Sequence, residues 1–372
     1  MIPPSRDGVG DAAFKLHTLM QGKNISSFLL TSADQENGGE IIALVREWNL
    51  GSFQGIKNAL VKRDITHVVF HYPSPKFFRN ISLSFLPLFL RMNGFATVTY
   101  VHEFAVYSIL GRLRVMILML WSKTIITADS PSYHLAEKIP LIRRKVRLLP
   151  HGSNIVAVPP EYFSEGRVRR VEEPVGKLQL LFFGFIRSGK GLEAILDAFG
   201  KNSGIRESFQ LSIVGGLSAA KNHADEELLN RIENIGGVRY LGYLDQNELP
   251  KVFATTDVVI LPFEEGVTER RGSFMTAMMF GKTLITTKPI IPIEGLEHFH
   301  NIIFIDNSTL PEIETILQKV SEFHKKTLYE IGNAARLWYE DRYSDGCVIK
   351  RFLEVNGISD VNSMSCKNSG RE

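Results

Sequence analysis

Short apolar runs, many of them β-branched, recur along most of the chain and alternate with segments of helical apolar spacing. In the first part these runs are Ser27–Leu30, Thr66–His71, Thr97–Val101, Thr124–Ala128 and Val146–Leu149. In the second part they are Leu178–Phe183, Leu211–Val214, Val238–Leu241, Val258–Leu261, Leu284–Thr287 and Ile302–Ile305. Runs of this kind are typical of strands covered on both faces of a parallel sheet. The alternation therefore predicts an α/β chain with doubly wound sheets.

The 372 residues are enough for two domains, and local composition indicates where they meet. The segment 156–177 contains three prolines and a charge cluster without a sustained period, which is typical of a linker. The first domain resembles a Rossmann half whose first strand is short or missing, because only Met1 and Ile2 stand before the Gly8–Asp11 turn. Whether that strand is vestigial or the given start is late stays open. The predicted organisation is 1–155, an N-terminal Rossmann-like domain; 156–177, the linker; 178–345, a C-terminal Rossmann-like domain; 346–358, a terminal helix that could pack back on the first domain; and 359–372, a disordered tail.

Charge is unevenly spread along the chain, although the net charge is only +3. Residues 76–147 contain eleven Lys or Arg against three Asp or Glu. This excess indicates an anionic partner, such as a membrane surface or a phosphorylated substrate, while the absence of a recognised motif disfavours nucleic acid. No apolar run approaches the ~20 residues of a membrane span, and the N-terminus shows no signal peptide pattern. We expect a cytoplasmic protein, either free or at the inner face of the membrane.

Two polar loops follow buried strands of the second half, and both lead into helices. Gly184–Gly191 combines glycines with two cations, which could hold a diphosphate. Pro262–Gly272 carries Glu264, Glu265, Glu269, Arg270 and Arg271, and a helix N-terminus follows it, where backbone amides favour anions. Ordinary surface turns with solvated charges are the alternative for both loops. In that case the paired arginines would form salt bridges with the glutamates within the loop.

The two stretches FFGFIRSGKGLEAILDAF and PFEEGVTERRGSFMTAMMFGKTLITT together resemble the family-4 retaining glycosyltransferases of the GT-B fold, in a branch with an RRGS loop. Three upstream segments also resemble the family's motifs: PPSRDGVGD, VTYVHE and LLPHG. The resemblance covers roughly residues 3 to 355. It implies two Rossmann-like domains that face each other across a cleft: the first, 1–155, would bind the acceptor, and the second, 178–345, would hold most of the nucleotide-diphospho-sugar.

Residue roles follow from the same resemblance. Arg187 and Lys190 would hold the donor diphosphate, and His102 would lie near the sugar; these are the catalytic candidates. His67 and His71, which bracket a strand, are interpreted as structural. The implied donor-binding residues are Gly8, Gly10, Gly184, Glu265, Thr268, Arg271, Gly272, Ser273, Phe274 and Thr276. Thr268 and Thr276 stand where the family commonly has two glutamates.

The function implied is transfer of a sugar from a nucleotide-diphospho-sugar to a glycan or lipid-linked acceptor, with retention, in surface polysaccharide biosynthesis. No DxD-like motif is present, so we expect no metal and no cofactor beside the donor substrate. The alternatives are a nucleotide-sugar epimerase or phosphorylase-like enzyme of the same fold, and a catalytically degenerate scaffold or partner subunit. A dinucleotide oxidoreductase is disfavoured, because no GxGxxG with a following acidic residue opens either half.

Overall fold

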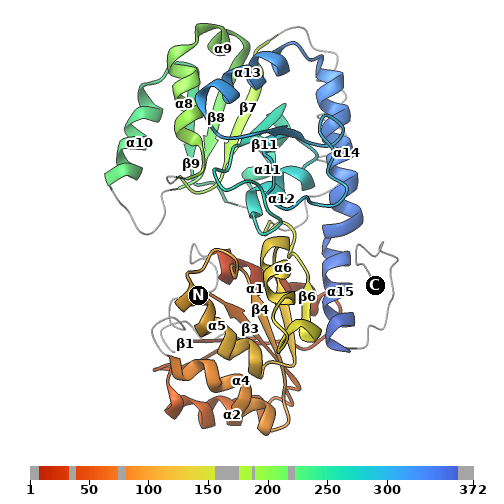
Figure 1. Cartoon of the computed structure of the whole chain (residues 1–372). Coiled ribbons are helices and arrows are strands. Elements are labelled where there is room, and N and C mark those ends of the chain that lie inside the picture. The colour runs from red at the N-terminus through yellow and green to blue at the C-terminus, as the bar shows by residue number, and fades with distance from the viewer. Residues whose placement is uncertain are drawn as a thin grey trace. The chain divides into compact units, whose positions relative to one another are not determined.

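The computed structural model describes residues 8–32, 39–73, 81–155, 176–186, 189–216, 223–245 and 247–358, without the side chains of 223–226 (Figure 1). These residues form two compact units. Unit 1 contains residues 8–154 and 345–358, and unit 2 contains residues 155–344. Each unit contains parallel β-sheet and helices, which confirms the predicted α/β class.

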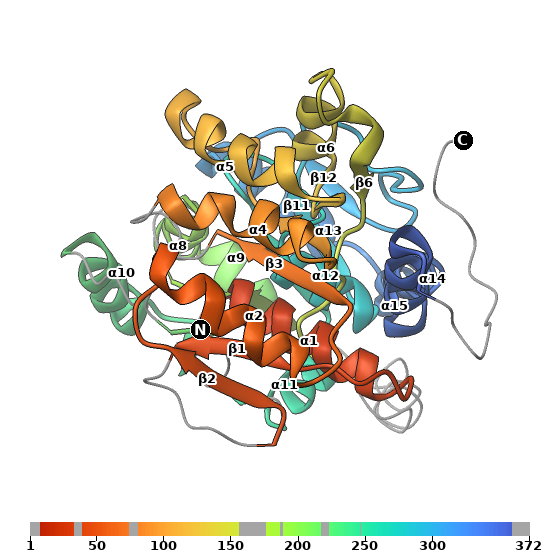
Figure 2. The ribbon, with the colours of Figure 1, turned by 90° about the horizontal axis from the view of Figure 1, so that it is seen from below.

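Unit 1 has two parallel sheets. One is a pair, β1 (Leu29–Ser32) and β2 (Ile41–Val45), which lie beside each other in Figure 2. The other has the order β3-β4-β5-β6 and consists of β3 (His67–Tyr72), β4 (Ala96–Val101), β5 (Thr124–Thr127) and β6 (Val146–Leu148). The helices are α1 (Gly8–Gln21), α2 (Phe53–Val61), α4 (Leu86–Met92), α5 (Ile109–Trp121), α6 (Ser130–Glu137) and α15 (Asp345–Asn356). Short 3₁₀ turns are η1 (Leu50–Ser52), η2 (Ile81–Phe85) and η3 (Arg143–Lys145).

The beginning of unit 1 differs from the sequence expectation. The segment Gly8–Asp11 was expected to be a turn, but α1 already starts at Gly8. A doubly wound sheet with the order 3-2-1-4 would have one more strand between β1 and β3. Among the described residues no strand precedes α1, and the sheet is divided at that place. Strand β2 was not predicted at all.

Helix α15 packs on unit 1, although it follows unit 2 in the chain. Its apolar residues Ile349, Phe352 and Leu353 share a core cluster with Leu16 and Met20 of α1. Burial of such side chains stabilises by about 1.5–3 kcal/mol each relative to exposure. This packing therefore holds the end of the described chain on the first unit.

Unit 2 has one six-stranded parallel sheet with the order β12-β11-β10-β7-β8-β9. Its strands are β7 (Leu178–Phe183), β8 (Phe209–Val214), β9 (Val238–Gly242), β10 (Val258–Leu261), β11 (Thr283–Thr287) and β12 (Ile303–Ile305). Its helices are α8 (Leu192–Lys201), α9 (Ser203–Ser208), α10 (His223–Asn234), α11 (Leu249–Thr255), α12 (Gly272–Met279), α13 (Leu310–Ser321) and α14 (Lys325–Tyr343). All six strands coincide with predicted runs to within two residues. Every residue of β10 and β11 is buried, as their continuous apolar or threonine-rich sequences indicated.

Candidate functional site

The order of strands in unit 2 identifies where a ligand can enter. The chain runs outward from β7 through β8 to β9, and then returns to β10 on the other side of β7. The neighbours β7 and β10 therefore form the topological switch point, where open α/β sheets bind ligands at the carboxyl ends of the strands. The loops that follow these two strands are Gly184–Gly191 and Pro262–Arg271. The sequence singled out the same two loops for their charges and glycines.

The two loops touch each other through glycines. A Cβ added at Gly184 would lie 3.7 Å from the Cβ atom of Ser273, in the helix α12 that directly follows the second loop. Gly191, with φ of +69°, approaches more closely still, because a Cβ there would lie 2.2 Å from the Pro262 carbonyl oxygen. Only glycine allows this conformation together with this contact. The backbone itself thus fixes the spacing of the two loops.

Two cations, one from each loop, lie close to a buried aromatic ring of the loop after β10. Phe263 is 1% exposed, and its ring lies 5.3 Å from the Lys190 Nζ atom and 4.6 Å from the Arg271 Cζ atom. Such cation–π contacts orient positive groups at a modest gain in energy. Arg271 also donates to Glu265 at 3.1 Å, and Arg270 lies 3.6 Å from the same carboxylate. The loop-internal salt bridges considered from sequence are therefore present with Glu265.

The first turn of α12 directly follows the loop after β10. Gly272, Ser273 and Phe274 are its first residues, and Arg271 at the N-cap gives no side-chain hydrogen bond to their amides. These N–H groups lack partners within the helix and suit an anion. The Phe274 side chain is fully buried and packs on Trp338, so only its backbone could contact a ligand. Thr276 is also buried, at 1% exposure.

Three buried oxygen atoms near these loops have no hydrogen-bond partner among the described residues. They are Thr268 Oγ1 in the loop after β10, Thr287 Oγ1 at the end of β11, and Glu193 Oε2 in the first turn of α8. Buried polar atoms are almost always paired, so such a group suits a ligand or water. Thr268 was a candidate from the family resemblance. Glu193 was missed, although its position three residues after Lys190 was a usable signal. Arg187 lies outside the described residues.

Three histidines meet at the carboxyl edge of the four-stranded sheet in unit 1. His71 belongs to β3, His102 follows β4, and His151 follows β6. The Nδ1 atom of His71 lies 3.2 Å from Nε2 of His102, and the ring centroids of His102 and His151 are 5.6 Å apart. His102 is only 4% exposed. His71 was interpreted as structural, yet it contacts the one histidine for which the resemblance implied a role.

The environment of these histidines keeps them neutral. Burial lowers the pKa of His71 to about 3 and that of His151 to about 4, with further lowering by His151 and Lys15 respectively. Burial, followed by the two neighbouring imidazoles, lowers the pKa of His102 well below its usual value. A neutral imidazole can donate or accept one hydrogen bond at each nitrogen. At neutral pH His102 is therefore suited to hydrogen bonding rather than to carrying a positive charge.

Lys15 in α1 contacts two other segments of unit 1, the one that follows β6 and the start of α15. Its Nζ atom donates to the Ser153 carbonyl and lies 2.6 Å from Asp345 Oδ1 at the start of α15. The lysine is 7% exposed, and a buried charge of this kind requires such partners. Ser153 and Asp345 lie next to the two points where the chain passes between the units. Of the other N-terminal candidates, Gly8 is exposed and Gly10 is buried, both within α1.

The chain is similar to known glycosyltransferases in sequence and in structure. Residues 177–320 match the family model described as glycosyl transferases group 1. Two similar solved structures are Anabaena Alr3699/HepE in complex with UDP and glucose (14% identity, 96% of this chain and 98% of that chain, TM-score 0.69) and a glycosyltransferase from Rickettsia africae (14%, 95% and 96%, 0.70). The chain has the GT-B fold. A third GT-B structure, WaaG, a glycosyltransferase involved in lipopolysaccharide biosynthesis, is 13% identical over 94% of this chain and 96% of its own, with a TM-score of 0.59.

The sequence resemblance to a glycosyltransferase is thus confirmed at two levels. Unit 2 carries a glycosyl transferases group 1 domain, and the predicted GT-B architecture is correct. The search of curated proteins found no significant match. Among the described residues, no group of His, Cys, Asp or Glu is arranged to hold a metal ion.

Proposed function

We propose that the protein is a retaining glycosyltransferase that moves a sugar from a nucleotide-diphospho-sugar to an acceptor hydroxyl, without a metal ion. The observation that carries this proposal is the pair of loops at the β7/β10 switch point, where Lys190, Arg271 and the first amides of α12 converge within a glycosyl transferases group 1 domain. The HepE structure, a complex with UDP and glucose, supports a nucleotide-sugar donor.

In this mechanism the main task is to stabilise the departing diphosphate. Cations and helix-end amides, which are already held in place, lower the energy of the charge that develops on the leaving group. The acceptor attacks on the same face of the sugar from which the nucleotide departs, and a donor phosphate oxygen receives the acceptor proton. Neutral His102 would supply a hydrogen bond to the sugar rather than take up a proton.

Lys190 offers a direct test. We expect Lys190→Ala to reduce donor hydrolysis, measured over a panel of UDP- and GDP-sugars, by about 100-fold, because a preorganised charge at the leaving group is lost. The matched control is Lys201→Ala, since Lys201 is 65% exposed in α8 and pairs with Asp197 of the same helix at 3.2 Å. Equal losses in the two variants would argue against the proposal. So would a larger loss on replacing Glu264 or Glu265.

The donor assay also separates the alternatives. A transferase consumes donor faster when a second sugar or lipid acceptor is added, whereas an epimerase converts the donor without an acceptor. If calorimetry shows no binding of UDP, GDP or their sugars, the protein is a scaffold. The replacement of the two family glutamates by Thr268 and Thr276 makes this last outcome worth measuring.

We further propose a glycan or lipid-linked acceptor at the cytoplasmic face of a membrane, as in surface polysaccharide assembly. The start of α5 supports this, because Ile109 is 76%, Leu110 75% and Leu113 58% exposed, and Arg114 is exposed beside them. Exposed apolar side chains next to cations suit the surface of an anionic bilayer. The similarity to WaaG, a glycosyltransferase involved in lipopolysaccharide biosynthesis, supports such an acceptor. None of the helices in the described ranges is long and apolar enough to cross a membrane.

Vesicle binding tests this surface. The full chain should sediment with phosphatidylglycerol vesicles, and the double variant Ile109→Glu, Leu110→Glu should lose most of that binding. Ile290→Glu is the control, because Ile290 is 81% exposed but belongs to unit 2 and not to α5. If the double variant binds as the unmodified chain does, α5 is not the membrane surface. If no chain binds, the membrane part of the proposal is wrong.

A further inference from the structure

A chain of hydrogen bonds joins three polar side chains of unit 1 near the amino ends of β1 and β2. Ser27 and Phe28 come just before β1, and Glu40 comes just before β2. Because β1 and β2 are parallel, their amino ends meet at one edge, next to the end of α1. The histidine cluster lies at strand carboxyl ends. The two groups of residues are therefore separate sites.

The middle member of this chain is His17 in α1, which is 8% exposed. Its Nδ1 atom lies 2.7 Å from the Ser27 Oγ atom, and its Nε2 atom lies 2.9 Å from Glu40 Oε2. A carboxylate can only accept, so Nε2 carries the hydrogen and donates to Glu40. The Nδ1 atom then has a free lone pair and accepts the Ser27 hydroxyl hydrogen. The other acceptor within reach of that hydroxyl, the His17 carbonyl, is farther away at 3.4 Å.

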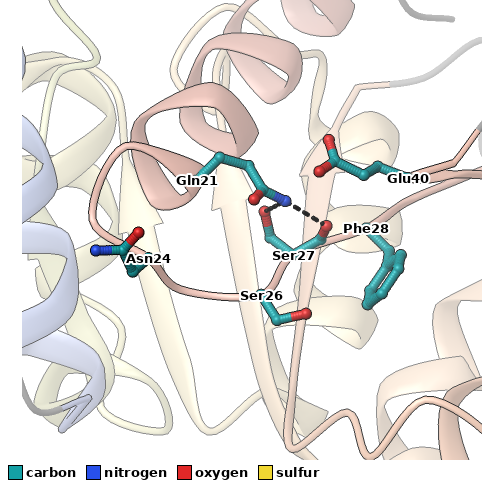
Figure 3. Close-up of a pocket in the computed structure, with 6 residues that line it drawn as sticks. All are labelled: Gln21, Asn24, Ser26, Ser27, Phe28 and Glu40. Carbon is teal, nitrogen blue, oxygen red and sulfur yellow. Dashed lines mark hydrogen bonds between the residues drawn. The ribbon is translucent and has the colours of Figure 1, made fainter.

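Ser27 also lines a pocket of about 310 Å³ (Figure 3). The other lining residues are Gln21, Asn24, Ser26, Phe28 and Glu40. The Gln21 Nε2 atom donates to the Ser27 carbonyl at 3.1 Å and lies 3.5 Å from Ser27 Oγ. In Figure 3 the Gln21 amide points at both oxygen atoms of Ser27. The volume lies at the lower end of the range for small-molecule sites, and the lining is rich in amide and hydroxyl groups.

We propose that Ser27 is an activated nucleophile, with His17 as its general base and Glu40 as the group that orients His17. The arrangement meets the geometric criterion for an activated serine: the base lies within hydrogen-bond reach of the hydroxyl, and a third group holds the base. The Gln21 amide donates to the Ser27 carbonyl and thereby helps to hold the Ser27 backbone in place beside the pocket. The polar lining suits a short-chain carboxylic ester of a polyhydroxylated alcohol.

The reaction balances without any redox partner. Ser27 Oγ attacks the ester carbonyl and forms a bond to its carbon, while the hydroxyl hydrogen passes to Nδ1 of His17. The carbon–oxygen bond to the alcohol breaks, and His17 returns the proton to the alcohol as it leaves. Water then attacks the acyl-serine with His17 again as base, so the acid is released and Ser27 is restored.

A fluorophosphonate probe tests the proposal without knowledge of the natural ester. Ser27 Oγ would attack phosphorus and fluoride would leave, giving one adduct that mass spectrometry locates on Ser27. Ser27→Ala should abolish the adduct. Ser203→Ala is the control, because Ser203 is an exposed serine of α9 in unit 2 and does not line the pocket. We expect His17→Gln to slow labelling about 100-fold, which is the typical contribution of a general base.

Glu40→Gln distinguishes activation from simple exposure of a serine. An amide can donate to His17 Nε2 and thereby favour the tautomer whose Nδ1–H cannot accept from Ser27, so labelling should slow about tenfold or more. Thermal melts of each variant confirm that the fold is retained. The proposal is overturned if the unmodified chain gives no adduct, if the adduct lies on Ser26, or if folded Glu40→Gln and His17→Gln label at the original rate.

Discussion

The three buried histidines make the stability of unit 1 depend on pH in a defined direction. In the unfolded chain a histidine titrates near pH 6.5, whereas burial in the folded unit lowers the pKa of His71 to about 3 and that of His151 to about 4. Between these values the unfolded state binds more protons than the folded state. The stabilising effect of the neutral histidines is therefore fully present above pH 6.5 and is lost progressively as the pH falls.

The size of the loss follows from these values. At pH 5 a histidine with an ordinary pKa is mostly protonated in the unfolded chain, whereas the buried histidine stays neutral in the folded unit. Each such histidine therefore lowers the free energy of the unfolded state, relative to the folded state, by about 2 kcal/mol. His71 and His151 together should thus reduce the free energy of unfolding by about 4 kcal/mol between pH 8 and pH 5, and His102 acts in the same direction. That is a large fraction of the stability of an ordinary domain.

Tryptophan fluorescence can follow unit 1 alone. Trp48 and Trp121 belong to unit 1 and Trp338 to unit 2, so a Trp338→Phe background restricts the signal to the first unit. Urea unfolding should show a midpoint that falls steadily from pH 8 to pH 5. In His71→Asn, which removes one of the titrating groups, the loss over this range should shrink by about 2 kcal/mol. A midpoint that does not change with pH, or a His71→Asn variant with the full original dependence, would refute this reasoning.

Two further predictions concern packing in the separate units. Gly191→Ala should destabilise unit 2 by about 2 kcal/mol or more, because a Cβ at φ +69° would lie 2.2 Å from the Pro262 carbonyl oxygen. Gly200→Ala, with nothing within 4 Å of the added atom, should instead be neutral or raise the melting temperature slightly. Lys15→Met should lower the urea midpoint of unit 1 by the equivalent of about 1–3 kcal/mol, since Asp345 and the Ser153 carbonyl lose their cation. Adding Asp345→Asn should recover part of that loss, and no recovery would mean that the ion pair itself contributes little.

The sheet of unit 2 could be predicted from sequence for a clear physical reason. Its strands are buried on both faces, so they read as short apolar runs bounded by polar loops, and Val258–Leu261 was predicted to the residue. Strand β2 was missed, because five residues at the edge of a pair carry little of this signal. The start of α1 was misjudged for a related reason, since glycines near a helix start resemble a turn.

The candidate site was predictable only in part. Loops that follow parallel strands can be expected at one edge of a sheet, which is why the loops after β7 and β10 were found. Contacts between residues at the ends of different strands are harder to predict from sequence, because they depend on the order of the strands in the sheet. His71 and His151 come 31 residues before and 49 residues after His102, and nothing in that spacing shows that β3, β4 and β6 belong to one sheet. The relay from Ser27 to Glu40 was missed, because its members come from a helix and two strand starts.

The close contacts that glycines make in the loops of unit 2 determine which amino-acid substitutions this protein tolerates. Gly191 meets the backbone of Pro262, and a Cβ at Gly215, in the loop after β8, would lie 1.8 Å from the Gly184 carbonyl oxygen. Gly191 and Gly215 make these contacts through their backbone atoms alone. In a saturation library scored for folded protein, Gly191 and Gly215 should accept no replacement, while the charged residue Lys190, next to Gly191, should accept many. A map of tolerance would then separate the residues that shape the loops from those that act on a ligand.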